Sequence, residues 1–250
     1  MNKILNKILL VFVFPLFIAF PAYAVTFQGG DTVAMQGAQS TIFPSANSDE
    51  FAHDFADLVG WTTSGSASIV SGQLEVVTAL TGADWARSPS LTTRQEYWIQ
   101  FKYKLNSISD LVANERTFGT GLRSATIGNI ATVGIQGIGT DQHWYVRWKT
   151  DASEGSNLGD LSSPQIVTGA DYTVVIHWKS ATAPAADDGV FQAWAISNGA
   201  VQTLADLSNI DSDTVTAELF QGGNFDSSGI IATILIDDLV VGTTGQEYVP

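Results

Sequence analysis

The amino-acid sequence predicts an all-β protein, folded as a sandwich of two antiparallel sheets, and three observations support this fold class. After residue 60, short segments rich in β-branched and aromatic residues alternate with clusters of Gly, Pro, Asn, Asp and Ser. No segment sustains a 3.6-residue apolar period over three helical turns. The chain has no cysteine, so a large core must stabilise it. Many short strands at this spacing are typical of a sandwich or a barrel.

Residues 1–24 have the layout of a secretory signal peptide. Lys3 and Lys7 supply positive charge, an apolar run follows them, and Ala22 and Ala24 supply a small-residue cleavage site. The apolar run is shorter than the roughly 20 residues that a membrane-spanning helix needs. We therefore expect this segment to be removed and the mature protein to be secreted or periplasmic.

The mature chain is strongly acidic. Loss of Lys3 and Lys7 leaves nine basic residues against 25 acidic ones, so the formal net charge changes from -14 to -16. Such a chain repels nucleic acid and anionic lipid surfaces, and neither is an expected partner. No later segment is long and apolar enough to insert into a membrane. The absence of cysteine excludes disulfides, thiol catalysis and thiolate metal sites.

The mature chain is predicted to be an arm followed by one domain. Residues 25–46 are polar and contain glycine, which is typical of an N-terminal arm. Residues 47–250 form one predicted domain, because no Pro-rich or charged linker follows residue 50. Within it, residues 49–61 (DEFAHDFADLVGW) come nearest to helical periodicity, and their apolar residues could line one face of a short helix.

The remaining segments are predicted strands separated by turn signals such as TGAD, APAADDG, ISNG and DSSG. Alternation along the strands places Trp144, Trp148, Trp178 and Phe191 on core faces. The predicted strands are residues 72–80, 96–105, 116–123, 131–139, 142–150, 171–180, 189–197, 215–223 and 230–242.

The order of landmarks along residues 49–242 resembles the LamG-like jelly rolls of the concanavalin A-like lectin/glucanase superfamily. These landmarks are an acidic-aromatic opening before Trp61, a strand ending in Trp178 and Lys179, an Asp-Gly hairpin before a strand that carries Trp194, and a closing strand with an Asp-Asp pair. The resemblance implies two stacked antiparallel sheets, one of them concave, on which glycans often lie. It also implies a structural calcium ion where the opening of the chain meets its last strand.

The outward faces of four predicted strands share one chemical character. In strand 142–150, the core face leaves His143, Tyr145 and Arg147 outside. Basic residues gather on such faces: Lys102, Lys104, Arg147, Lys149 and Lys179. The predicted carbohydrate-binding residues are Trp98, Gln100, Lys102, His143, Tyr145, Arg147, His177, Gln192 and Trp194.

Aromatic faces stack on sugar rings and clustered cations receive carboxylates, so these residues predict a surface for an acidic glycan. The alternative is a set of ordinary solvated strand faces. A single binding surface requires the four strands to share one sheet, which the sequence leaves open.

Two catalytic alternatives can be compared with the sequence. Jelly-roll glucanases carry Glu-x-Asp-x-x-Glu on one strand, and no Glu-x-Asp occurs here. A polysaccharide lyase acting on uronate-containing glycans needs residue types that Gln100, His143, Tyr145, Arg147 and His177 supply. The lyase motifs Arg-x-Glu-x-Arg and Gln-x-His are absent. We therefore predict carbohydrate binding without catalysis, with a lyase as the alternative and a surface or matrix adhesion protein as a second alternative.

An acidic pair interrupts the last predicted strand. Asp237 and Asp238 stand inside the apolar run TILIDDLVV, where one carboxylate would point toward the core or the sheet edge. Calcium bound by carboxylates could compensate that charge, with Asp49 and Glu50 from the opening as further ligands. The alternative is a pair of hydrogen-bonded aspartates at a strand end.

Overall fold

The structure is a computed structural model. The predicted signal peptide (1–24) and the whole of the predicted arm (25–46) lie outside its described residues. The described part of the chain comprises residues 49–78, 83–111, 115–116, 119–149, 164–212, 214–224 and 230–243. This part contains no helix, and thus no helix long and apolar enough to cross a membrane.

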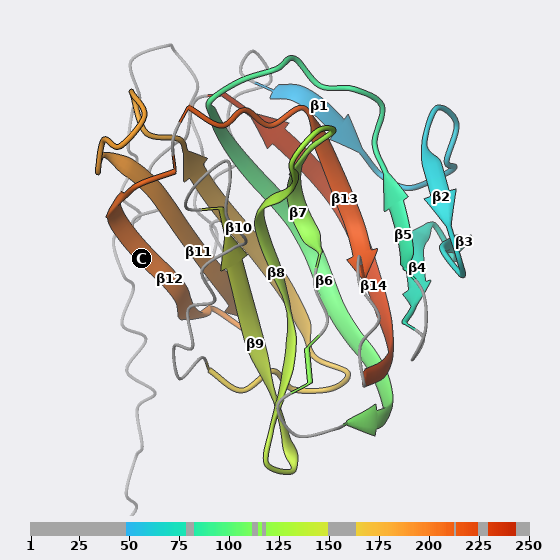
Figure 1. Cartoon of the computed structure of the whole chain (residues 1–250). Coiled ribbons are helices and arrows are strands. Elements are labelled where there is room, and N and C mark those ends of the chain that lie inside the picture. Colours follow the sequence, from blue (N-terminus) through green and yellow to red (C-terminus); the bar gives the residue numbers. More distant parts are fainter. Residues whose placement is uncertain are drawn as a thin grey trace, which may run out of the picture. The chain divides into compact units, whose positions relative to one another are not determined.

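The larger of the two sheets has eight antiparallel strands, in the order β12-β11-β10-β6-β14-β4-β3, with β1 paired to β14 (Figure 1). Its two longest strands, β6 and β14, pair along most of their length at the centre of the sheet. The strands are β1 (Asp49–His53), β3 (Ser68–Val70), β4 (Gln73–Val77), β6 (Glu96–Leu111), β10 (Asp171–Lys179), β11 (Gly189–Ser197), β12 (Ala200–Ile210) and β14 (Ile230–Gly242).

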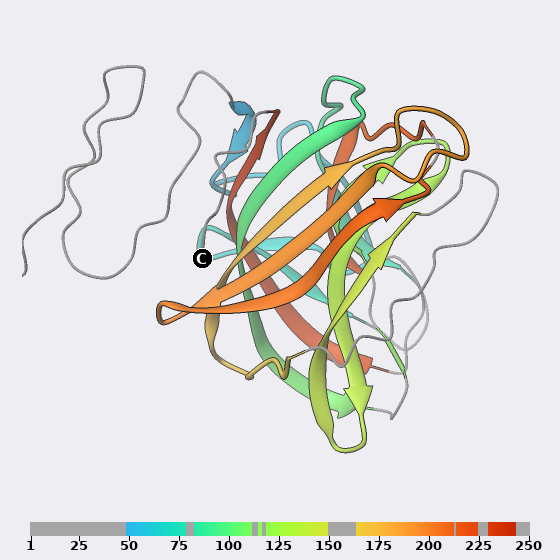
Figure 2. The same cartoon turned by 90° about the vertical axis from the view of Figure 1, so that its left-hand side faces the viewer.

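The second sheet has six antiparallel strands in the order β2-β5-β13-β7-β8-β9, and it forms a separate layer over the first (Figures 1 and 2). Its β9 is an edge strand that pairs with β8 over eight residues. The strands are β2 (Thr62–Ser64), β5 (Asp84–Arg87), β7 (Thr120–Ser124), β8 (Gly128–Ile138), β9 (Asp141–Trp148) and β13 (Leu219–Asn224).

The predicted core residues are confirmed. Trp144, Trp178 and Phe191 are fully buried, and Trp148 is 7% exposed. Rings from both sheets meet in one core, because Trp148 stacks on Phe191 with a centroid separation of 5.5 Å. Alternation therefore assigned the inward faces of β9, β10 and β11 correctly.

Each predicted strand overlaps an observed strand, but β1, β2, β3, β5 and β12 were not predicted as strands. The suggestion of a short helix at residues 49–61 is wrong, since Asp49–His53 pairs with β14. Four of the missed strands have five residues or fewer, too short for a clear apolar period. The exception, β12, pairs only with β11, and its apolar residues do not alternate regularly, since the neighbours Leu204 and Ala205 are both buried.

A β-bulge explains how the acidic pair fits into β14. Asp237 pairs with Lys102 and Val240 pairs with Gln100, so β14 contains one extra residue at this point. Asp238 adopts a left-handed conformation with φ of 47°. Leu239 returns to the core, while both aspartates stay partly exposed. The bulge thus removes the buried charge that simple alternation predicted.

Candidate functional site

The structure divides the predicted carbohydrate-binding residues between two surfaces. His143, Tyr145 and Arg147 lie on β9 of the six-stranded sheet. The other six lie on β6, β10 and β11 of the eight-stranded sheet. The two sheets enclose one core, so their outer faces point in opposite directions. The four strands, whose shared sheet the sequence left open, therefore belong to two sheets, because β9 pairs with β8.

We call the outer face of the six-stranded sheet the arginine face. Cross-strand partners lie on the same face of a sheet, and here they form a continuous row over β5, β13, β7, β8 and β9. The row is Arg87, Gln221, Gly121, Thr132 and Arg147. Its two arginines are separated by four strand spacings, about 19 Å between backbones. Small residues occupy its centre.

One end of the row is held by a hydrogen-bonded chain. Arg87 Nε donates to Gln221 Oε1 at 2.9 Å, and Gln221 Nε2 donates to the carbonyl oxygen of Gly119 at 3.3 Å. The Arg87 guanidinium also lies 3.6 Å from the ring centroid of Trp85, a cation–π contact. Partial burial lowers the pKa of Arg87. The guanidinium of Arg87 is therefore held in one orientation and is partly desolvated.

Arg123 lies beside this end of the row and is 8% exposed. Its Nη1 donates to Asn129 Oδ1 at 3.1 Å. Burial first, and the positive charge of Arg87 second, lower the pKa of Arg123 to about 10, against a smaller opposing effect of Glu218. Arg123 is still charged at neutral pH, so two partly desolvated cations repel each other here. A bound carboxylate or sulfate would relieve this repulsion.

The other end of the arginine face surrounds Tyr145. The Arg116 guanidinium lies 5.0 Å from the Tyr145 ring centroid, and its Nη1 lies 3.4 Å from the phenol oxygen. His143 pairs with Gln136 across the strands and forms a bridge with Gln165. Tyr145 is 2% exposed, whereas His143 and Arg147 are partly exposed. Guanidinium, imidazole, phenol and amide groups therefore converge over β8 and β9.

Sequence reasoning found three residues of this face and missed the others. The missed residues are Arg87, Arg116, Arg123, Gln136 and Gln221. Alternation along DWAR and TGLR could have identified Arg87 and Arg123 as outward, because each follows a core residue directly. The local sequence could not show that β5 and β7 both pair with β13 in one sheet.

We call the outer face of the eight-stranded sheet the tryptophan face. The Trp98 ring stacks on His177 at 4.0 Å between centroids and lies nearly parallel to Trp194 at 6.4 Å. Trp194 is only 8% exposed. Much of the aromatic surface predicted to stack on sugars therefore packs within the protein. Gln100 pairs with Val175 on the same face.

A polar chain crosses four strands of the tryptophan face. His177 Nε2 lies 3.0 Å from Glu96 Oε1, and His177 Nδ1 lies 3.1 Å from Gln192 Oε1. Gln192 Nε2 donates to Asp206 Oδ1 at 2.8 Å. The Asp206 carboxylate accepts from the amide nitrogen, which directs the amide oxygen of Gln192 toward His177. Both predicted polar residues are thus engaged within the sheet.

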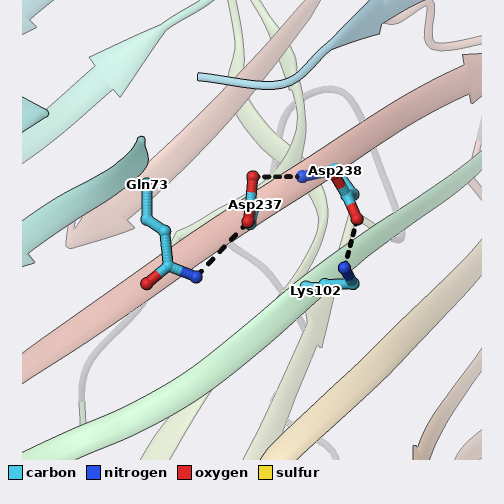
Figure 3. Close-up of polar contacts among 4 residues, drawn as sticks. All are labelled: Gln73, Lys102, Asp237 and Asp238. Carbon is cyan, nitrogen blue, oxygen red and sulfur yellow. Dashed lines mark hydrogen bonds and ion pairs between the residues drawn. The ribbon is translucent and has the colours of Figure 1, made fainter. Parts of the chain in front are cut away.

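The predicted metal ligands at the closing strand already have protein partners (Figure 3). Asp238 forms an ion pair with Lys102, and this hydrogen bond raises the pKa of Lys102. Asp237 Oδ2 accepts from Gln73 Nε2 at 3.3 Å. Among the described side chains, no three His, Asp or Glu residues form a group that could hold a metal ion.

The strand register also separates the two halves of the predicted calcium site. Asp49 pairs with Gly242, four residues beyond Asp238 and about 13 Å along β14. Calcium binding by Asp49, Glu50, Asp237 and Asp238 stays a prediction, because the side chains of Asp49 and Glu50 are outside the described part of the structure.

Melting curves measured with calcium and with EDTA test this prediction. An ion bound only to the folded protein stabilises it, so EDTA should lower the Tm by several degrees. Asp49→Asn should abolish the difference, and Asp237→Asn, which changes a carboxylate bonded to Gln73, tests whether the closing strand contributes a ligand. Identical curves in calcium and EDTA would remove calcium from the description of this protein.

No protein-family model and no curated protein matches the sequence. Among solved structures, alginate lyase Aly36B in complex with an alginate trisaccharide is similar, with 18% identity, a TM-score of 0.53, and coverage of 80% of this chain and 96% of that chain. The globular domain of Trypanosoma (T.) cruzi calreticulin has 12% identity and a TM-score of 0.52, covering 80% and 90% of the two chains. The CBM2 module of an evolved Dit protein from Lactobacillus casei BL23 phage J-1 has 12% identity and a TM-score of 0.50, covering 81% and 98%.

These likenesses define the class of fold. The chain is an all-β protein whose two antiparallel sheets form a concanavalin A-like jelly-roll sandwich. Carbohydrate-binding lectins and polysaccharide lyases share this fold. At these identities the likeness extends to the fold alone, so function must be argued from the residues of the site.

Proposed function

We propose that this protein is an exported, lectin-like protein that binds an acidic polysaccharide through the arginine face. One observation carries the proposal: four of the five arginines of a chain with net charge -14 gather on this face. Random placement on an acidic protein would scatter them among its two outer faces, edges and loops. Their concentration on one face favours an anionic ligand.

The chemistry of the face suits the carboxylates of a polyuronate. Guanidinium groups bind carboxylates with two parallel hydrogen bonds, and partial desolvation strengthens each contact. Gly121 and Thr132 carry small side chains between Arg87 and Arg147 and are buried, so a polyuronate would contact the row at its two partly exposed arginines. On the outward positions of the described strands of this sheet, Asp141 at the start of β9 is the one acidic residue.

Other parts of the proposal rest on the sequence. Residues 1–24 serve as a signal peptide, which gives a secreted or periplasmic protein. Within the concanavalin A-like fold, the order of landmarks over residues 49–242 favours the LamG-like group. The alginate trisaccharide bound by Aly36B supports a uronate polymer as the class of ligand, by analogy of fold.

Binding at increasing salt concentration tests this function. The mature chain should bind alginate or polygalacturonate at low ionic strength, and affinity should fall as NaCl shortens the Debye length from about 30 Å at 0.01 M to about 3 Å at 1 M. Neutral glucans offer no carboxylate and should bind more weakly at low salt. Binding confined to neutral glucans, with no salt dependence, would reject an anionic ligand.

A polysaccharide lyase is the second candidate, favoured by the contact between Arg116 and the Tyr145 phenol. A phenol beside a guanidinium combines a group that can exchange the C5 proton of a uronate with one that can bind its carboxylate. An absorbance assay for unsaturated uronate, after incubation of the protein with polyuronates, distinguishes a lyase from a protein that only binds. We expect no product. Product that disappears in Tyr145→Phe, with binding retained, would establish the lyase instead.

A further inference from the structure

A cavity of about 340 Å³ opens on the tryptophan face, on the opposite side of the sandwich from the arginine face. It lies over four adjacent strands, β10, β6, β14 and β4. The side chains that define it are Gln73, Lys102, Lys104, Asp171, Leu235 and Asp237. All of them belong to strands, which hold groups more precisely than loops do.

The polar groups of the cavity are held in place by contacts within the protein. Lys104 Nζ lies 3.1 Å from Asp171 Oδ1, and Gln73 donates to Asp237 at 3.3 Å. Figure 3 shows how Asp237 lies between Gln73 and the backbone nitrogen of Asp238, which donates to Asp237 Oδ1 at 2.9 Å. Side chains that are ordered before a ligand arrives reduce the entropic cost of binding.

Positive and negative side chains are interspersed around the cavity, and this mixture favours one class of ligand. The ammonium groups of Lys102 and Lys104 stand among the carboxylates of Asp171, Asp237 and Asp238. A polyanion would meet these carboxylates, and a cation would meet the two ammonium groups. A neutral polyhydroxylated molecule can use both, because each hydroxyl group donates and accepts hydrogen bonds.

The size and floor of the cavity point to the same class. Its volume is near the lower end of the roughly 300–1,000 Å³ found for small-molecule sites. Leu235 supplies an apolar patch that the C–H face of a sugar ring can cover. Asp237 lies on this face by regular alternation, two residues after Leu235, and the bulge adds Asp238 to the same face beside Lys102.

We propose that this cavity binds a small neutral sugar, a mono- or disaccharide, independently of the arginine face. The sugar places hydroxyl groups between the ammonium and carboxylate groups and an apolar ring face on Leu235. The protein then has two carbohydrate sites of different chemistry on opposite faces, one for uronate polymers and one for a neutral saccharide unit.

Amide chemical shifts, measured while D-glucose, cellobiose or D-glucuronate is added, test the proposal. Cellobiose and glucose should shift the amides of residues 102–104 and 235–237, and glucuronate should bind this cavity more weakly. Lys104→Met and Asp237→Asn should each weaken cellobiose binding about tenfold, the usual effect of losing a hydrogen bond to a charged group. Lys179→Met, on β10 of the same sheet but outside the cavity, should leave it unchanged.

The arginine face supplies an internal control for folding and for the proposed function. Lys104→Met should keep the polyuronate affinity of the unmodified protein, so a failure of one site is distinguishable from a failure of the other. Neutral sugars that shift no amides of the cavity would overturn the proposal. So would equal cellobiose affinity in Lys104→Met, Asp237→Asn and Lys179→Met.

Discussion

Trp144→Ala is expected to lower the free energy of unfolding by about 3–5 kcal/mol, a large share of the stability of a typical domain. Trp144 lies on the edge strand β9 and is fully buried. Its ring packs against Tyr103 at 5.1 Å and edge-on against Tyr172 at 5.2 Å, both from the other sheet. Truncation to alanine therefore leaves a cavity between the sheets and removes contacts that hold β9 in place.

Urea unfolding followed by circular dichroism measures this loss. Trp98→Ala is the matched control, because Trp98 is a partly exposed tryptophan on an outer face. We expect it to cost less than half as much. Trp144→Phe keeps most of the volume and should fold, with a loss of roughly 1–2 kcal/mol, even where the alanine variant does not. Similar losses for Trp144→Ala and Trp98→Ala would contradict the core described above.

The double substitution Arg87→Gln and Arg123→Gln is expected to lower polyuronate affinity by about 100-fold or more. Hydrogen bonds to charged groups contribute about 1.5–3 kcal/mol each, and two guanidiniums are removed. Each is partly desolvated, since burial lowers both pKa values. Folding stability should change far less than affinity, because the substitution also removes the repulsion between the two cations.

Single substitutions and pH provide the controls for the arginine face. Arg147→Ala should weaken polyuronate binding more than Lys149→Ala, because a lysine at the exposed end of a strand contributes only about 0–1 kcal/mol. Affinity should be constant between about pH 8 and 9, where guanidiniums and uronates are charged. It should fall as the pH rises through about 10, where Arg123 loses its proton. Titration calorimetry measures the affinity of each variant for polyuronate at each pH. Unchanged affinity in the double variant would show that the arginine face is not the binding surface.

Local pattern predicted the core of this protein well. Strict alternation in β9 and β10 places Trp144, Trp148 and Trp178 inward, and the structure confirms all three. This success has a simple cause, because the period of a strand is two and a buried face demands apolar residues. The same rule placed His143, Tyr145 and Arg147 outward on β9.

Alternation fails where the backbone departs from a regular strand. At Asp237 and Asp238 the pattern demanded one inward carboxylate, and a bulge keeps both on the outer face. A bulge adds one residue and leaves no reliable trace in a single sequence. Asp237 also lines the cavity beside Lys104, a role that the sequence did not indicate because the cavity is formed by four strands distant in the sequence.

The sequence by itself determined the all-β class, most of the longer strands with their inward faces, and the acidic charge against which a gathering of arginines stands out. Only the tertiary structure decided which sheet each strand joins, because strand pairing is a long-range property that the side-chain pattern of one strand does not encode. Because β9 pairs with β8, it lies in the six-stranded sheet, whereas β6, β10 and β11 lie in the eight-stranded sheet. Arg147 and Trp98 are therefore on different outer faces. Strand pairing also aligned Arg87 with Arg147 in one row, although the two residues are 60 positions apart in the sequence.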